Sequence, residues 1–305
     1  MKLFTIAVAL IGGSLFSRDI GLNYRSQTPI SANRLNKNPA PVFSRFYELY
    51  QSEARPALPM ISAHRGASRV TPENTLAAFK KAIEMGADFI EIDVRTTLDG
   101  QQVCMHDGSL KRTTGLDSEV KKVSYKKIKT LSAGAWFGAQ YASERVPSLE
   151  AVCQLVTRMN KSGNTMVHLY VDCKDIRETE VIRILNQYQL LDSAVFYGNV
   201  NTLQEIRKIA PTARLMPAHP GRDQVDRVTH ALHPFAYDVA WNKVDAALVV
   251  DCHKRGIKVF SDLLGESDVA SQYRKAIRLG IDLIQTDDVS SVKDCISTYQ
   301  KEKVK

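Results

Sequence analysis

The feature that most constrains the fold is a regular alternation of two kinds of segment along most of the chain. Short apolar runs rich in β-branched residues alternate with amphipathic stretches of about 10–14 residues, the pattern of successive βα units around a parallel sheet. The expected strands are Met60–Ala63, Phe89–Val94, Met166–Cys173, Ala194–Tyr197, Ala213–Met216, Tyr237–Trp241, Lys258–Ser261 and Leu283–Thr286. The expected helices are Thr75–Met85, Leu149–Met159, Arg177–Tyr188, Asn201–Ile209, Asp223–Leu232, Asp245–Lys254, Asp268–Leu279 and Val289–Tyr299. Eight of each predict an α/β fold, a (β/α)8 TIM barrel.

One connection in this pattern is much longer than the others. The segment Gln101–Pro147 separates the second strand from the next helix, whereas βα loops usually have about 2–6 residues. It begins with a further short strand, Gln102–His106. We therefore expect a barrel domain over residues 59–300, with a small insertion over residues 107–147 at one end of the barrel.

The first 58 residues do not follow the alternation. An apolar run from Leu3 to Ile11 follows Lys2 and precedes small residues, which is the pattern of a secretory signal peptide. The run is shorter than the roughly 20 residues that a membrane span needs. We expect a signal peptide over residues 1–17, a polar arm or linker over 18–58, export to the periplasm or medium, and no stable membrane span. The alternative is an N-terminal extension on a cytoplasmic protein.

The chain has a formal net charge of +8, which favours anionic ligands such as phosphates or a membrane surface. Much of the excess comes from scattered lysines, as is typical of a solvated surface. No interleaved basic and aromatic motif is present, so the sequence does not predict binding to nucleic acid.

Five cysteines give little information about the cellular compartment. Cys104 and Cys173 lie in predicted strands, where cysteine usually acts as a small buried hydrophobic residue. The spacings match no zinc pattern. A disulfide among Cys153, Cys252 and Cys295 stays open for an exported protein.

Acidic residues gather near the ends of two predicted strands, where barrel enzymes place their catalytic groups. Side chains alternate between faces along a strand, so Glu91 and Asp93 point the same way. Asp172 stands near the end of the third predicted strand of the barrel. Three close carboxylates are costly to bury without a compensating charge, and together they suit one divalent cation, Ca²⁺ or Mg²⁺. The alternative is that they form ion pairs with Arg65 and Lys174.

Two histidines, His64 and His106, stand at strand ends beside these acids. Histidine titrates near neutral pH, so one imidazole can accept a proton while the other delivers one. Arg65 and Lys174 add a forked donor and a compact positive charge, both suited to phosphate. A lone histidine is more often structural, but this setting makes phosphodiester cleavage the simplest interpretation.

These residues lie within longer motifs. The motifs are His64-Arg65-Gly66-Ala67, Thr71-Pro72-Glu73-Asn74-Thr75, Gly86-Ala87-Asp88-Phe89-Ile90-Glu91-Ile92-Asp93-Val94, Thr97-Leu98-Asp99-Gly100, His106-Asp107, Leu110-Lys111-Arg112-Thr113-Thr114-Gly115, Trp136-Phe137, Glu144-Arg145-Val146-Pro147-Ser148-Leu149-Glu150 and Gly280-Ile281-Asp282-Leu283-Ile284-Gln285-Thr286-Asp287-Asp288. Together they closely resemble the glycerophosphodiester phosphodiesterase family, within the phospholipase C-like phosphodiesterase superfamily. The resemblance extends from about Ile61 to Ser290.

The resemblance implies a (β/α)8 barrel that hydrolyses a small-molecule phosphodiester, a glycerophosphodiester, to an alcohol and glycerol 3-phosphate. It implies that Glu73 organises the first loop and that residues 107–147 form a small subdomain over the barrel mouth. By position in the motifs, the acid–base pair is His64 and His106, the metal ligands are Glu91 and Asp93, and the phosphate contacts are Arg65 and Lys174.

Two positions differ from the family pattern. Asp172 stands where the family usually has Glu in a Glu-x-Lys motif, so its carboxylate is one methylene shorter. Phe260 stands where the family often has the Trp of a Trp-Thr-Val-Asn motif, which changes the expected pocket wall. Trp241, at the end of the sixth predicted strand, is a candidate replacement for that wall, and a buried structural role is its alternative.

Two other functions compete with this one. A phospholipase-type phosphodiesterase acting on membrane lipids would use the same chemistry, and a catalytically silent barrel could bind phosphorylated ligands. The sequence leaves open which histidine is the acid, whether water or a substrate hydroxyl attacks, and the oligomeric state.

Overall fold

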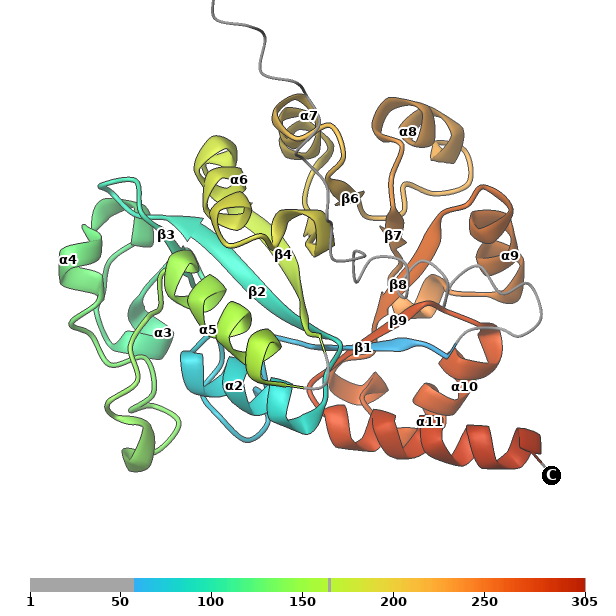
Figure 1. The fold of residues 1–305 in the computed structure, drawn as a ribbon, viewed down its shortest axis with the longest axis horizontal. Coiled ribbons are helices and arrows are strands. Elements are labelled where there is room, and N and C mark those ends of the chain that lie inside the picture. Colours follow the sequence, from blue (N-terminus) through green and yellow to red (C-terminus); the bar gives the residue numbers. More distant parts are fainter. Residues whose placement is uncertain (1–57, 164–165, 305) are drawn as a thin grey trace, which may run out of the picture. The chain divides into compact units, whose positions relative to one another are not determined.

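A computed structural model describes residues 58–163 and 166–304 of the chain (Figure 1). The predicted signal peptide, residues 1–17, and the predicted arm, up to residue 57, lie outside the described residues. The barrel and its insertion lie within them, apart from residues 164 and 165.

Eight parallel strands form a nearly closed barrel, with helices on its outer side (Figure 1). In sheet order the strands run β6-β5-β4-β2-β1-β9-β8-β7. The ends of this order meet through backbone hydrogen bonds, for example from Phe235 N to Leu215 O at 2.8 Å and from His219 N to Asp238 O at 2.7 Å. The strands are β1 (Met60–Ala63), β2 (Phe89–Thr96), β4 (His168–Asp175), β5 (Val195–Tyr197), β6 (Arg214–Met216), β7 (Ala236–Asp238), β8 (Lys258–Asp262) and β9 (Leu283–Thr286). This arrangement confirms the predicted TIM barrel.

The eight predicted helices are present, with ends that shift by a few residues. They are α2 (Leu76–Met85), α5 (Leu149–Ser162), α6 (Glu178–Gln187), α7 (Val200–Ile209), α8 (Val225–Leu232), α9 (Ala246–Lys254), α10 (Ala270–Leu279) and α11 (Val289–Val304). The side chain of Thr75 caps α2 by accepting a hydrogen bond from Ala78 N at 3.2 Å. Gly86 ends the same helix at φ 84°, in the left-handed region where glycine carries no steric penalty.

The alternation of side chains along β2 separates a core from a site. Ile90, Ile92 and Val94 belong to the main hydrophobic core, which the strands form with the surrounding helices. The intervening Glu91 and Asp93 therefore face the inside of the barrel. The hydrophobic pattern that packs the helices thus also directs the acids inward, as predicted from the sequence.

The insertion after β2 has a small core of its own. It starts with β3 (Gln102–Cys104), which pairs antiparallel with β2 and is two residues shorter than the predicted strand. The segments α3 (Lys111–Thr114), η1 (Val120–Lys122), α4 (Tyr125–Ile128) and η2 (Ala139–Tyr141) follow. The buried apolar residues of this core are Val103, Met105, Leu110, Val120, Ile128, Ala133 and Val146.

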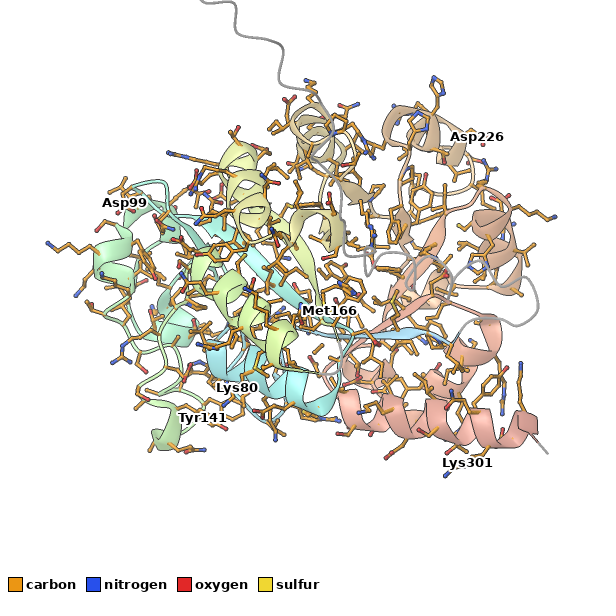
Figure 2. All side chains as sticks on the ribbon, in the orientation of Figure 1. Lys80, Asp99, Tyr141, Met166, Asp226 and Lys301 are labelled. Carbon is orange, nitrogen blue, oxygen red and sulfur yellow. The ribbon has the colours of Figure 1, made fainter. Side chains whose placement is uncertain are left out.

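The insertion also contacts the loop between β1 and α2. Tyr141, labelled in Figure 2, donates its hydroxyl hydrogen to the backbone oxygen of Val70 at 3.1 Å. Ala77 N, in the first turn of α2, donates to Glu144 Oε2 at 3.3 Å. The insertion is therefore attached to the segment that follows the first barrel strand.

Two further expectations concern the cysteines and the membrane. All five cysteines are buried and free, so the disulfide that the sequence left open among Cys153, Cys252 and Cys295 is not formed. Among the described residues, no helix combines the length and apolarity needed to cross a membrane.

Candidate active site

The structure brings together the three carboxylates that the sequence selected. Asp93 on β2 lies directly beside Asp172 on β4 in the strand register. One carboxylate oxygen from each of Glu91, Asp93 and Asp172 lies within 4.8 Å of the others. Glu91 and Asp93 are only 2% and 1% exposed. The cluster thus holds up to three negative charges in a place that water reaches poorly.

Burial of the cluster changes the pKa values of its carboxyl groups. Burial raises the pKa of the Glu91 carboxyl well above its ordinary value, and the neighbouring carboxylates of Asp93 and Asp172 raise it further. Burial also raises the pKa of Asp172. One hydrogen bond opposes this effect at Glu91, because the backbone N–H of Arg65 donates to its Oε2 at 2.6 Å. The cluster therefore favours an added positive charge.

Two side chains supply part of that charge. Lys174 Nζ lies 2.5 Å from Asp172 Oδ2 and 3.3 Å from Asp93 Oδ1. Burial alone would lower the pKa of Lys174, but the attraction of Asp172 and Asp93 outweighs it and raises the pKa. Arg65 Nε lies 3.5 Å from Asp93 Oδ2. The ion pairs that the sequence offered as an alternative are present, and they coexist with the carboxylate cluster.

The donor set fits a hard divalent cation. It consists of carboxylate oxygens alone, which Ca²⁺ and Mg²⁺ prefer. Asn74 fixes one of the three groups, since its Nδ2 donates to Asp93 Oδ2 at 2.7 Å. Asn74 directly precedes the expected helix Thr75–Met85 and is a residue type that often caps helices, but it has φ 54°, and Thr75 is the residue that caps α2.

His64 is held by a carboxylate at the end of the last barrel strand. Its Nδ1 lies 2.9 Å from Asp287 Oδ1, which also accepts a hydrogen bond from Ser68 Oγ at 2.8 Å. Burial would raise the pKa of Asp287, but the hydrogen bonds from His64 and Ser68 help to lower it below its ordinary value. Asp287 is therefore ionised and favours the tautomer with the proton on Nδ1, in which Nε2 of His64 is the acceptor nitrogen.

His106 has the same arrangement with its neighbour. Its Nδ1 lies 2.7 Å from Asp107 Oδ1. The guanidinium of Arg112 lowers the pKa of Asp107 through a direct hydrogen bond. Arg95 fixes the backbone, because its Nε and Nη2 donate to the carbonyl oxygen of His106 at 3.0 and 2.7 Å. Both histidines thus have Nδ1 engaged by an ionised carboxylate.

A small pocket of about 280 Å³ opens beside His64. It contains the cation Arg65 and the acid Asp287 together with polar groups of the surrounding loops. Its lining residues are His64, Arg65, Ser68, Arg69, Glu73, Gly265, Asp268 and Asp287. Its size suits a small group, and its lining carries charges of both signs, Arg65 and Arg69 beside Glu73, Asp268 and Asp287.

The aromatic residues proposed for the pocket wall lie as follows. Trp241 is not in a strand: β7 ends at Asp238, and Trp241 begins the short helix η4 (Trp241–Lys243). Its Nε1 donates to Gln272 Oε1 at 3.0 Å, and its ring packs on the main core. Phe260 is fully buried, with its ring 6.3 Å from that of Phe89. A role for Trp241 in the pocket wall stays a prediction.

Sequence reasoning did not assign a role to several residues that hold the site. Asp287, Asn74 and Arg112 were quoted only as members of motifs, yet each contacts a proposed site residue or its partner. Asp287 could have been found from the barrel alone, because it follows the strand that must lie beside β1 when the barrel closes.

Comparison with known proteins agrees with this geometry. Residues 64–291 match the model of the Glycerophosphoryl diester phosphodiesterase family. A glycerophosphodiester phosphodiesterase of Caldanaerobacter subterraneus subsp. tengcongensis is 32% identical over 236 residues, which cover 75% of this chain and 94% of that protein.

Solved structures show the same fold. The glycerophosphodiester phosphodiesterase of Agrobacterium tumefaciens matches with a TM-score of 0.70 and 25% identity, covering 78% of this chain and 100% of that one. A phosphodiesterase of Oleispira antarctica, solved in complex with the product sn-glycerol-3-phosphate, matches with a TM-score of 0.70 and 26% identity, covering 79% and 97%. The chain therefore belongs to the glycerophosphoryl diester phosphodiesterase family and is a phosphoric diester hydrolase.

Proposed function

We propose that the chain hydrolyses water-soluble glycerophosphodiesters to an alcohol and glycerol 3-phosphate, with His64 and His106 as the acid–base pair. The observation that carries the proposal is that each imidazole has Nδ1 held by a carboxylate, at 2.9 and 2.7 Å. An imidazole fixed in this way presents Nε2 to the substrate in a defined tautomer and orientation. The product bound to the Oleispira antarctica phosphodiesterase supports glycerol 3-phosphate as the product here.

We further propose that Glu91, Asp93 and Asp172 hold one divalent cation, Ca²⁺ or Mg²⁺. Such an ion would stabilise the negative charge of the phosphodiester and of its transition state. The mutual proximity of the three carboxylates, within 4.8 Å, supports this assignment. The burial of Glu91 and Asp93 supports it too, because a buried pair of acids needs a counter-charge.

The chain's own cations and imidazoles would carry the remaining steps. Arg65, in the pocket beside His64, and Lys174, at the acid cluster, would orient the phosphoryl oxygens and balance their charge. One histidine would remove the proton of the attacking oxygen, which belongs to water or to a hydroxyl of the glycerol moiety. In the second case the first product would be a cyclic phosphate, which water would then open to glycerol 3-phosphate. The other would protonate the oxygen of the departing alcohol as its bond to phosphorus breaks.

A turnover screen tests the proposed function. Purified protein is supplied with glycerophosphodiesters that differ in head group, with Ca²⁺, with Mg²⁺ or after chelation, and released glycerol 3-phosphate is measured enzymatically. The expected result is glycerol 3-phosphate in amounts equal to the released alcohol, loss of activity after chelation, and recovery when metal is restored. Metal uptake without release from any head group would instead indicate a silent binding barrel.

A second assay separates soluble substrates from lipids. The same protein is supplied with phospholipid vesicles, and release of phosphorylated head groups is measured. The proposal expects activity on glycerophosphodiesters and none on vesicles. Preferential activity on vesicles would establish the phospholipase-type alternative.

A further inference from the structure

One guanidinium group joins the insertion to the first loop of the barrel. Arg112, on α3, donates from Nη1 to Glu73 Oε2 at 2.7 Å and from Nη2 to Glu73 Oε1 at 2.8 Å. It also donates from Nε to Asp107 Oδ2 at 2.7 Å and from Nη2 to Asp107 Oδ1 at 3.1 Å. Arg112 thus makes a two-point contact with each of two carboxylates at once.

Both carboxylates lead to a residue of the proposed active site. Glu73 Oε1 accepts a hydrogen bond from Arg65 Nη1 at 3.1 Å, and Asp107 Oδ1 accepts one from His106 Nδ1. The contacts form an unbroken series with Arg112 at its centre, from the phosphate-binding arginine on one side to an acid–base histidine on the other. We call the central three residues, Glu73, Arg112 and Asp107, the bridge.

The residues of the bridge are ionised, so its hydrogen bonds join charged groups. Burial would raise the pKa of Glu73, but the hydrogen bonds and charges of Arg112 and Arg65 outweigh it and lower the pKa. Glu73 is therefore ionised, and its side chain is only 11% exposed. Bidentate bonds between a guanidinium and a carboxylate fix orientation as well as distance. The side chain of Arg112 is 42% exposed, so the bridge is expected to contribute little to the stability of the fold.

We propose that Arg112 is a positioning residue, which sets the orientation of Arg65 and His106 relative to each other through Glu73 and Asp107. The inference rests on the proposed function of those two residues and gives the insertion a role, because its α3 supplies the guanidinium that contacts Glu73 and Asp107 together. A lysine cannot reproduce this arrangement, because an ammonium group lacks the planar fork that contacts both carboxylates.

The test compares Arg112→Ala, Arg112→Lys and Lys111→Ala in the full chain. Lys111 is the matched control, because it is the neighbouring cation on α3 and pairs with the exposed Asp117 instead. Since a misplacement of about 1 Å can cost roughly 100-fold in rate, Arg112→Ala is expected to lower kcat for glycerol 3-phosphate release by about 10–100-fold. Arg112→Lys should lie between Arg112→Ala and wild type, and Lys111→Ala within about twofold of wild type. Thermal melting should show all three variants folded at the assay temperature.

A double variant separates positioning from an unrelated structural effect. If Glu73 and Arg112 act through one series of contacts, Glu73→Gln combined with Arg112→Ala should be no slower than the slower single variant. Multiplying effects would overturn the proposal, as would unchanged kcat in Arg112→Ala or wild-type kcat in Arg112→Lys. If the wild-type protein releases no glycerol 3-phosphate, the proposed function itself fails. If the wild-type protein is active but the variants contradict the expected pattern, only the positioning role of Arg112 fails.

Discussion

Nδ1 of His64 lies 2.9 Å from Oδ1 of Asp287, although 223 positions separate the two residues in sequence. The closed barrel explains the contact. Strands β1 and β9 are parallel neighbours with Ala63 opposite Thr286, so the next residue of each strand emerges at the same point of the barrel mouth. The first and last strands of the barrel therefore bring His64 and Asp287 together.

This contact predicts the effect of Asp287→Asn. An amide keeps the size of the side chain but can also donate to Nδ1, so it no longer selects the tautomer with Nε2 free. In a comparable aspartate–histidine pair such a change lowers kcat by about 10⁴, and we expect a loss of about 10²–10⁴ here. Asp288→Asn is the control, because Asp288 caps α11 by accepting from Ser291 N, and asparagine caps equally well. Equal activities in the two variants would contradict the prediction.

The histidines themselves give a second prediction. His64→Ala and His106→Ala should each lower turnover by about 10²–10⁴-fold, because general acid–base catalysis contributes that much, with thermal melting close to wild type. His253→Ala is a matched control, since His253 also pairs with an aspartate, at 2.7 Å from Asp282 Oδ2, but near the opposite end of β9. A variant at His64 or His106 with near-normal turnover would remove that residue from the mechanism.

The carboxylate cluster gives a third prediction, measured by calorimetric titration with Ca²⁺ or Mg²⁺. Asp172→Asn removes one of the three proposed anionic ligands and should weaken cation affinity by at least about 10-fold. Asp172→Glu keeps the charge and should bind the cation more tightly than Asp172→Asn. Asp175→Asn, at the exposed end of the same strand, should leave affinity unchanged. Wild-type affinity in Asp172→Asn would remove this residue from the metal site.

The sequence predicted the barrel and the inward acids because both depend on local patterns. Apolar residues that alternate with Glu91 and Asp93 place these acids on one face whatever the rest of the chain does. The partners of the histidines are different, because they depend on which strands become neighbours. Asp107 follows His106 directly, but Asp287 reaches His64 only when β9 closes on β1.

Other features depend on details that patterns do not encode. The sixth predicted strand continued to Trp241, but β7 ends at Asp238 and the chain turns into a 3-10 helix. Asn74 resembles a helix cap by residue type, yet its amide satisfies the buried Asp93 instead. The position of Arg112 depends on the path of the long insertion. The sequence of the insertion has no long helical or strand periodicity from which this path could be predicted. Tertiary contacts decided each of these cases.

The buried carboxyl group of Asp238 gives the last prediction, which concerns the stability of the fold. Asp238, at the end of β7, has a buried Oδ1 that lacks a hydrogen-bond partner among the described residues. Burial, and then the charges of Asp262 and Asp172, raise the pKa of Asp238 from 3.8 to about 8. Between about pH 4 and pH 8, the folded state therefore keeps the carboxyl proton of Asp238, whereas the unfolded state releases it.

It follows that stability linked to Asp238 is fully present below about pH 4 and is lost as pH rises toward about 8. Asp238→Asn cannot ionise, so its free energy of unfolding should fall less than that of wild type between pH 5 and pH 8, by at least about 1 kcal/mol. Urea titrations at both pH values, in chelator, measure the difference. Asp223→Asn, at an exposed position, should retain the wild-type slope. A wild-type slope in Asp238→Asn would mean that Asp238 is ionised in the folded protein across this range.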